Sequence, residues 1–481
     1  MFLRQVSNIP VGMTFTDIAI AVYLLYGGCN LLFVRDIPLD MLFLRDWMIY
    51  VLLYIGIRNI GSKNLVVWSV IGVGLIQAII GMIQWLGWFA SNHPDFLATG
   101  TFQNPGPYGG LLAVSFVAAV WMFCRTTRFR VFLWGILFML LIMLVVSNSR
   151  ASWLAVLIGV IALFPKFYRG LTKKITLVAT MGIVLGCLYF LRPGSADARL
   201  LIWQVCMGLV DEAPLFGHGI GTLSLYYMSA QADYFAIHPY SELSLVANNN
   251  YQAFNEFLHV FVEQGVVGFV LLFCIIFTCR RSSYFSLVLV WFVFSMFSYP
   301  ADCGLLMVVL VLCIALCAEN GSVWNMTFNR KWLLCGLLVL PFVFVVTWEH
   351  GHAIKRIESD NAPRFPYNRE YMLQFAGLKQ DINILEALTR NVCSSTDILC
   401  DMGGHYEMQG NVKKADSCYT LARQMVPCRM IPLYRLYLLY ENRDSIVARK
   451  YARQILDFKS PLIGSVVVRA RADAKKYLNY E

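Results

Sequence analysis

Polar residues that could do chemistry gather in short segments beside apolar runs of the chain. A charged side chain at the end of a membrane span is costly unless it is paired or faces a wet cavity, so each such residue is a candidate for a functional site. In chain order the segments are Thr101–Pro105, Ser147–Arg150, Arg199 with Trp203 four residues later, Pro214–Gly219, Phe254–Leu258 and Glu263–Gly268.

Two arginines indicate what this chemistry could be. Arg150 immediately precedes an apolar run, and Arg199 lies in a long segment between two such runs. Two guanidinium groups facing one cleft would suit a diphosphate leaving group, because each planar group can donate two hydrogen bonds to phosphate oxygens. The alternative for Arg150 is that its side chain reaches out to lipid headgroups. The residues alone favour neither interpretation.

The composition shows which elements must position these residues. Of the 481 residues, 58% are hydrophobic and only 14% are charged, against about 25% charged in soluble proteins. Residues 349–481 hold 20 of the 39 Lys and Arg and 15 of the 29 Asp and Glu. We therefore predict a membrane domain over residues 1–348 and a soluble domain over 349–481. The net charge of +10 does not indicate nucleic acid, because the basic residues lie between hydrophobic runs.

The apolar runs predict an all-α, polytopic membrane protein of about eleven spans, within a range of ten to twelve because several runs are short. The runs fall at about 12–34, 41–57, 65–90, 106–124, 131–147, 151–165, 175–191, 256–279, 283–299, 303–318 and 331–348.

The distribution of Lys and Arg predicts the orientation. With the N-terminus inside, fourteen of these residues lie in inner loops and five lie at the outer side, as the positive-inside rule requires. The first span lacks a small-residue cleavage site and is expected to stay as an anchor. An odd number of spans then places the soluble domain outside, whereas a count that is wrong by one would place it inside.

The longest outer loop, residues 192–255, is too long for a hairpin connection and rich in aromatic residues, so we expect it to be ordered and functional. Residues 200–210 read as an amphipathic helix. Pro214 with Gly217, Gly219 and Gly221 reads as a tight turn.

The soluble domain has the pattern of a tetratricopeptide repeat (TPR), a 34-residue pair of helices. A second, less regular copy follows, and residues 367–394 and 460–481 are expected to add flanking helices. Such a domain predicts a peptide or protein partner, and the alternative is a docking cap without a ligand. Four cysteines in this domain, Cys393, Cys400, Cys418 and Cys428, allow one or two disulfides if it lies outside. The first copy places its small, aromatic and proline positions at Gly403, Tyr406, Ala415, Tyr419, Ala422 and Pro427.

These segments also carry a family resemblance. Gly-Thr-Phe-x-Asn-Pro, Ser-x-Ser-Arg, Arg-x-x-x-Trp, Pro-Leu-Phe-Gly-x-Gly and Asn-x-x-Leu…Glu-x-Gly-x-x-Gly occur in this order between the spans. In this the chain resembles the O-antigen ligase family, which includes polysaccharide polymerases and protein O-oligosaccharyltransferases. The resemblance covers about residues 65–320. The soluble domain over 349–481, called the tail below, resembles that of a subgroup that carries TPR domains.

The resemblance implies a reaction at the periplasmic face of a bacterial inner membrane. A glycan moves from undecaprenyl diphosphate to an acceptor hydroxyl, which belongs to lipid A core, a glycan chain or a protein Ser or Thr. The family uses no nucleotide, cofactor or metal, in agreement with the absence of His, Asp and Cys clusters at ligand spacing. Arg150 and Arg199 would neutralise the diphosphate. The expected substrate-binding residues are Asn104, Trp203, His218, His238 and Asn255.

The chain departs from the family pattern at one position. Many members have His-Asn where this chain has Phe254-Asn255, so the histidine proposed there as a base or acceptor-orienting group is missing. We expect Glu256 to take over its catalytic role, with His259 one helical turn further on a similar face.

Two other functional classes compete with a transferase. A transporter or flippase for lipid-linked glycan would also combine many spans with polar residues, but we find no internal repeat, and apart from Asp17 the candidates gather at the outer face. The second rival is a non-catalytic scaffold whose tail recruits glycan-assembly proteins.

Overall fold

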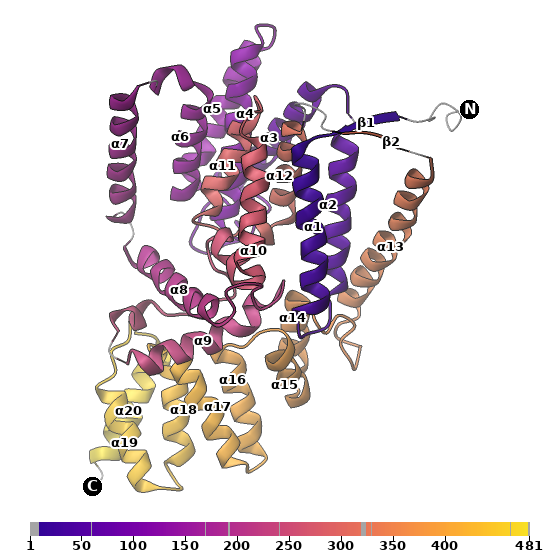
Figure 1. Cartoon of the computed structure of the whole chain (residues 1–481). Helices are drawn as coiled ribbons and strands as arrows, with labels where there is room; N and C mark the ends of the chain where they lie inside the picture. Colours follow the sequence, from indigo (N-terminus) through magenta and orange to yellow (C-terminus); the bar gives the residue numbers. More distant parts are fainter. Residues whose placement is uncertain are drawn as a thin grey trace.

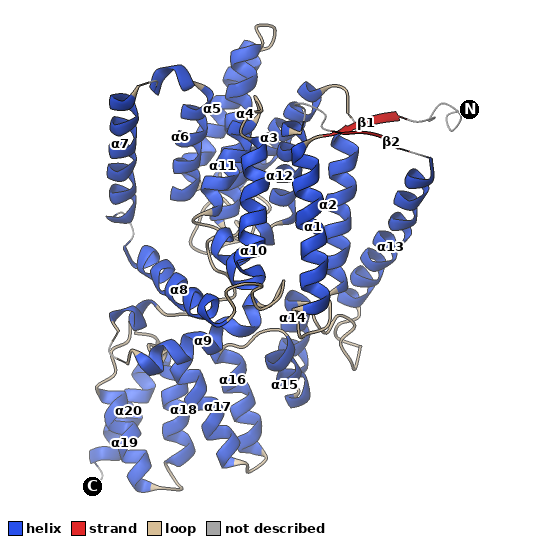
Figure 2. Cartoon of the chain, in the orientation of Figure 1, coloured by secondary structure: helices blue, strands red, loops and turns tan. Residues whose placement is uncertain are grey.

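The computed structural model describes residues 9–58, 60–168, 170–190, 193–239, 241–318, 324–328, 330–461 and 463–479. Within them the chain is helical apart from one two-stranded antiparallel sheet, β1 (Ile9–Met13) with β2 (Trp324–Phe328). A bundle of apolar helices forms the upper part of the molecule in Figure 1, and helices of the outer loop and the tail form the lower part (Figures 1 and 2). The sheet is a small addition to the predicted all-α fold.

Each of the eleven predicted apolar runs falls on a helix. Four of these helices, α1, α3, α4 and α10, are long and apolar enough to cross a membrane, and α5, α6, α11 and α12 are shorter apolar helices. The protein is therefore a polytopic helical membrane protein, and the exact number of spans stays a prediction. The bounds are α1 (Phe15–Phe33), α2 (Met41–Arg58), α3 (Lys63–Trp85), α4 (Pro105–Arg125), α5 (Arg130–Val146), α6 (Arg150–Leu163), α7 (Leu171–Phe190), α10 (Glu256–Cys279), α11 (Phe285–Ser295), α12 (Gly304–Cys317) and α13 (Arg330–Lys355).

Helix α4 is the centre of the bundle and packs against α3, α5, α6 and α11. Its small residues make this possible, since helices in membranes approach closely where Gly, Ala and Ser line the contact. A Cβ atom on Gly109 would lie 2.6 Å from the Cβ of Ser149, and one on Gly110 would lie 2.5 Å from the ring of Phe294. Side chains at the start of α6 and on α11 therefore pack directly against the backbone of α4.

The described residues of the predicted outer loop form three helical elements. Helix α8 (Pro193–Glu212) contains the predicted amphipathic segment 200–210, and α9 (Leu223–Ile237) and a short 3-10 helix, η3 (Glu242–Val246), follow it. Leu201, Val205 and Leu209 form the buried face of α8, which packs on α9 and α10. These elements cover the end of the bundle that faces the tail (Figure 1).

Among its described residues, the regular elements of the tail are all helices. Each helix packs mainly against the next one along the chain. Gly403 lies against Tyr419, where a Cβ atom would come within 2.4 Å of the ring, as the predicted repeat requires. The TPR assignment itself stays a prediction, and the four tail cysteines are free thiols. The helices are α14 (Arg369–Lys379), α15 (Ile382–Asn391), α16 (Thr396–Met408), α17 (Val412–Met425), α18 (Met430–Tyr440), α19 (Ser445–Leu456) and α20 (Ser465–Asn479).

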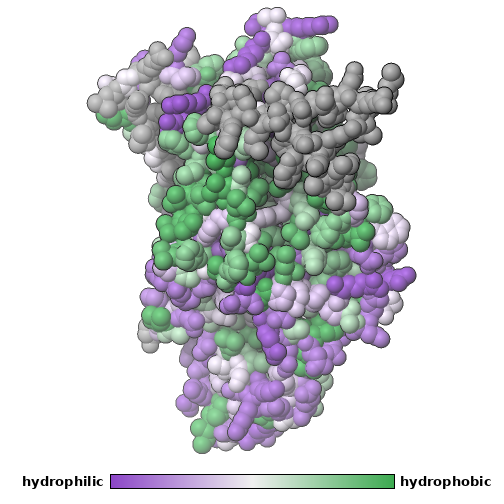
Figure 3. Space-filling view, turned by 45° about the vertical axis from the view of Figure 1, so that its right-hand side comes forward, coloured by the Kyte–Doolittle hydropathy of each residue, from purple (hydrophilic) through white to green (hydrophobic). Residues whose placement is uncertain are grey.

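The face of the molecule seen in Figure 3 has an apolar and a polar part, and the predicted division into two domains stays a prediction. In Figure 3 hydrophobic side chains form a band across the described part of the bundle, and hydrophilic side chains predominate below it. Helix α13 continues to Lys355, so the predicted domain boundary at residue 348 falls inside one helix. The tail and the outer loop lie at the same end of the bundle (Figure 1).

We predict that Gly110→Ala destabilises the protein by about 1–3 kcal/mol, because the added methyl group overpacks the contact with Phe294. The matched control is Gly135→Ala on α5, where an added Cβ meets nothing within 4 Å. The thermal unfolding midpoint in detergent should fall for Gly110→Ala and stay level or rise for the control. Equal midpoints for both variants would contradict the close α4–α11 packing.

Candidate functional site

Two of the predicted segments come together where α4 and α6 begin. Asn104 caps α4, and its side-chain oxygen accepts a hydrogen bond from the Gly106 N–H at 2.9 Å. Arg150 is the first residue of α6, directly after a turn in which Asn148 has a φ of 54°. Asn tolerates this left-handed conformation better than most residues do. The turn thereby places Arg150 beside the start of α4.

A cavity of about 420 Å³, which we call the arginine cavity, lies between these two helix starts, α8 and the end of α11. It brings together four of the predicted residues, Arg150, Arg199, Asn104 and Trp203. Aromatic rings make up much of the remaining wall, so the two charges lie in a largely apolar setting. The lining includes Phe96, Asn148, Ser149, Tyr189, Ser195, Phe254, Phe294, Phe297 and Ser298.

Two guanidinium groups share this cavity, and no carboxylate lines it among the described residues. Burial and the nearby charge of Arg150 both lower the pKa of Arg199 below its ordinary value, although Arg stays protonated in proteins. Arg199 donates hydrogen bonds to the hydroxyl and carbonyl oxygens of Ser195, at 3.1 and 3.3 Å. Its Nε atom is buried and has no hydrogen-bond partner within the described part of the chain. An anion in the cavity would satisfy this donor and relieve the repulsion between the arginines.

Phe254 also lines the arginine cavity. Its φ of 50° is unusual for a bulky residue and costs roughly 1–3 kcal/mol. The ring centroid lies 5.6 Å from the Cζ atom of Arg199 and 5.1 Å from the ring of Tyr299. Phe254 therefore offers Arg199 a cation–π contact and no proton acceptor.

Glu256 and His259 do not line the arginine cavity. Glu256 is buried and accepts a hydrogen bond from the Ala301 N–H at 2.9 Å, in the short 3-10 helix η4 (Pro300–Asp302). His259 lies between two carboxylates, with Nδ1 3.6 Å from Glu256 and Nε2 3.1 Å from Glu263. These contacts tie the start of α10 to its neighbours, and the catalytic role expected for the pair stays a prediction.

The turn at Pro214 and the Glu-x-Gly segment of α10 are joined by backbone hydrogen bonds in both directions, an arrangement that we call the backbone interlock. The motif residues in these two segments therefore have a structural role. At Gly265, with a φ of 64°, α10 leaves helical geometry. The N–H groups of Val266 and Val267 donate to the carbonyl oxygens of Pro214 and Leu215, at 2.9 and 3.4 Å. Two return bonds run from the turn to α10, each 2.9 Å long, from His218 N–H to Val262 and from Gly219 N–H to Glu263.

The carboxylate of Glu263 completes the interlock. It accepts hydrogen bonds from the N–H groups of Gly221 and Leu223, at 2.8 and 3.0 Å, where α9 begins. Asn30 of α1 also bonds this turn, through Phe216 at 2.8 Å and Ile220 at 2.9 Å. The motif glycines therefore allow three separate elements to share backbone hydrogen bonds.

The remaining predicted residues lie outside the arginine cavity. The Nε2 atom of His218 lies 2.8 Å from the carbonyl oxygen of Leu209. His238 ends α9 and stacks on Tyr234, with ring centroids 4.6 Å apart. Asn255 caps α10 by accepting hydrogen bonds from the N–H groups of Phe257 and Leu258, at 3.0 and 3.2 Å. Substrate binding by these three residues stays a prediction.

Sequence reasoning did not select four residues that line the cavity, Phe254, Asn148, Tyr189 and Ser298. Phe254 and Asn148 lie inside motifs, and attention to every motif position would have found them. Tyr189 and Ser298 come from the ends of apolar runs, where no sequence signal separates them from ordinary interfacial residues.

Comparison with known proteins supports the family resemblance. Residues 107–273 match the family model described as O-antigen ligase. This range contains the Arg150 and Arg199 motifs and both segments of the interlock, and it begins just after Asn104. No curated protein matches the chain. Residues 107–273 are therefore similar to O-antigen ligases, which supports a family that transfers or ligates lipid-linked glycans.

We predict that Gly265→Ala prevents stable folding, because its Cβ would lie 2.2 Å from the carbonyl oxygen of Leu215 at a positive φ. Gly208→Ala on α8 is the matched control, since nothing lies within 4 Å of its added Cβ. Limited proteolysis should cleave the outer loop much faster in Gly265→Ala than in the control. A wild-type cleavage pattern in Gly265→Ala would exclude the interlock.

Proposed function

We propose that this protein is a metal-independent glycan transferase that uses an undecaprenyl-diphosphate-linked donor. The observation that carries the proposal is the arginine cavity, where two guanidinium groups lie within a largely aromatic wall and the buried Nε of Arg199 has no hydrogen-bond partner among the described residues. The family match supports a lipid-linked glycan as substrate. The apolar wall is suited to a prenyl chain, and the arginines to its diphosphate.

The arginines would act where charge develops. As the glycosidic bond breaks, the bonding electrons pass to the diphosphate oxygen, and Arg150 and Arg199 stabilise that negative charge. Such stabilisation is strongest where water is excluded and the donors are already in place. Ser195 holds Arg199 in position through the two hydrogen bonds described above. The acceptor oxygen attacks the anomeric carbon and forms the new glycosidic bond.

The proton of the acceptor hydroxyl needs a destination. Neither Glu256 nor His259 lines the cavity, so the most direct acceptor is the departing diphosphate itself. Its terminal phosphate has a second pKa of about 6 once the sugar has left. On this proposal Glu256 and His259 position the start of α10 and thereby Phe254, instead of taking the proton.

The orientation and the tail complete the proposal. We infer an inner-membrane protein whose arginine cavity and tail both face the periplasm, supported by the Lys and Arg distribution and by their common end of the bundle. The tail is a TPR-like domain that binds a partner protein. The acceptor hydroxyl belongs to lipid A core, a glycan chain or a protein, and a transfer assay with each identifies it.

We predict that Arg150→Ala and Arg199→Ala each reduce glycan transfer about a hundredfold or more, since each removes a preorganised charge from the leaving group. Arg199→Lys should fall between wild type and Arg199→Ala, because lysine keeps the charge but loses the planar donor pair. The assay follows glycan movement from purified lipid-linked oligosaccharide. Arg128→Ala, in the α4–α5 connection at the opposite end of the bundle, is the control. Full activity in both alanine variants would refute the proposal.

A second prediction separates the two roles of Glu256. Glu256→Gln keeps an oxygen that can accept the Ala301 hydrogen bond, so we expect transfer within about tenfold of wild type and an unchanged pH profile. A general base would instead account for about a 10²–10⁴-fold loss and for one limb of the pH profile. Measuring kcat from pH 5 to pH 9 in the wild-type protein and in Glu256→Gln distinguishes these outcomes.

A further inference from the structure

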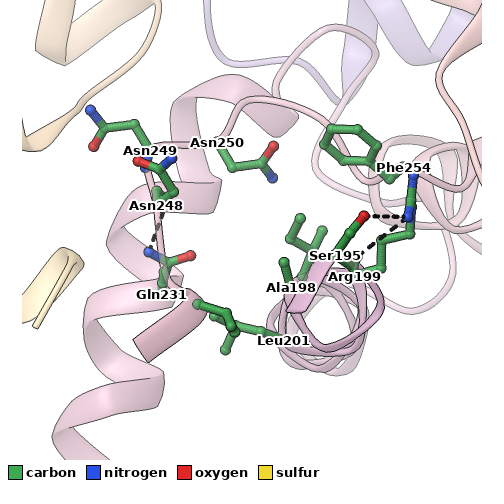
Figure 4. Close-up of a pocket in the computed structure, with 11 residues that line it drawn as sticks. Ser195, Ala198, Arg199, Leu201, Gln231, Asn248, Asn249, Asn250 and Phe254 are labelled. Carbon is green, nitrogen blue, oxygen red and sulfur yellow. Dashed lines mark hydrogen bonds between the residues drawn. The ribbon is translucent and has the colours of Figure 1, made fainter. Parts of the chain in front are cut away.

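A second, smaller pocket of about 220 Å³ adjoins the arginine cavity. Three residues, Ser195, Arg199 and Phe254, line both spaces. Figure 4 shows the pocket with these three on one side and the amides of Gln231 and Asn248–Asn250 on the other. We call it the amide pocket. The amide pocket lies on the other side of Arg199 from the arginine cavity, where we propose that the diphosphate binds. A ligand in the amide pocket would therefore lie next to the reacting bond.

The polar groups of the amide pocket are neutral apart from Arg199, and its lining contains no carboxylate. Amide groups can both donate and accept, which matches hydroxyl groups, since these do the same. The Asn248 side-chain nitrogen has no hydrogen-bond partner within the described residues, while its oxygen accepts from Arg429 at 2.9 Å. The Asn248 side chain is thus held in place through its oxygen, and its N–H groups remain available to a ligand.

Contacts with the tail fix this wall of the pocket. Asn249 accepts hydrogen bonds from the N–H and hydroxyl of Thr396, at 3.1 and 2.9 Å, and donates to Asp397 at 2.7 Å. Gln231 donates to the carbonyl oxygen of Met425 at 2.6 Å. The wall is therefore preorganised by a second domain, as a binding site requires.

The size and the aromatic edge narrow the class of ligand. A volume of about 220 Å³ is below the roughly 300–1,000 Å³ of pockets for drug-sized ligands, so the space suits one small ring. The Phe254 ring supplies an apolar face beside the polar wall. A neutral, hydroxyl-rich ring with C–H faces fits both features.

We propose that the amide pocket binds one neutral sugar residue adjacent to the glycosidic bond that is made or broken. The inference rests on the proposed transferase function and adds a sugar subsite to it. This sugar belongs either to the donor, attached directly to the diphosphate, or to the acceptor that carries the attacking hydroxyl.

Helix α8 offers a matched pair of variants. Ala198 lines only the amide pocket and Ala196 lines only the arginine cavity. Ala198→Phe would fill the first space, and Ala196→Phe the second. Asn248→Ala removes the available donor without adding volume. Met207→Phe, at an exposed position of the same helix, controls for the added aromatic group, and thermal midpoints in detergent check folding.

The probes are undecaprenyl diphosphate without sugar, the host's undecaprenyl-diphosphate oligosaccharide, and the acceptor found in the transfer assay. Ala198→Phe and Asn248→Ala should reduce transfer about tenfold or more, and both should bind sugar-free undecaprenyl diphosphate within twofold of wild type. Ala196→Phe should weaken binding of the sugar-free lipid.

Weaker binding of the glycosylated lipid alone assigns the pocket to the donor sugar, and a raised KM for the acceptor alone assigns it to the acceptor sugar. Transfer and both KM values within twofold of wild type in folded Ala198→Phe and Asn248→Ala would overturn the sugar subsite and leave the transferase function intact. A wild-type protein that neither binds the lipid diphosphate nor transfers glycan would overturn both.

Discussion

The structure depends on the backbone interlock between the Pro214 turn and the break in α10 at Gly265. Burying peptide groups at the end of a membrane bundle is costly unless each finds a partner, and here the turn and the broken helix supply partners to each other. Glu263 joins the start of α9 to the same point. This junction fixes the turn that follows α8 and thereby helps to hold α8, with Arg199, over the helix starts that carry Arg150.

The cavity built on this junction concentrates charge in an apolar place. The charge of Arg150 is felt by Arg199, and on the proposed function a bound diphosphate would offset the repulsion between the two groups. Phe254 adds to this electrostatic character, because its ring gives Arg199 a cation–π contact and offers no proton acceptor. On the proposed function, the site would rely on charge stabilisation more than on proton transfer.

The sequence predicted the helices and half of the site for identifiable reasons. Apolar runs of membrane length locate α3, α4 and α10 because the bilayer restricts both length and composition. Arg150 and Arg199 could be assigned to one site because a charged residue near a span is costly unless it is paired or faces a wet cavity. Glu256 and His259 were expected in the site, yet Glu256 accepts a hydrogen bond from Ala301 of a distant segment, and His259 contacts Glu263 one turn further along the same helix. Spacing on one helix contains no information about which neighbour a buried carboxylate meets.

The break in α10 also constrains the order in which the chain is assembled. The N–H groups of Val266 and Val267 have lost their helical acceptors and bond to Pro214 and Leu215, some fifty residues earlier. In lipid, each of these groups would cost several kcal/mol until its partner arrived. The segment between α7 and α10 must therefore fold against α10 before these two N–H groups are satisfied. Folding of the two segments is thus coupled, and α10 cannot reach its final geometry without the turn that precedes it.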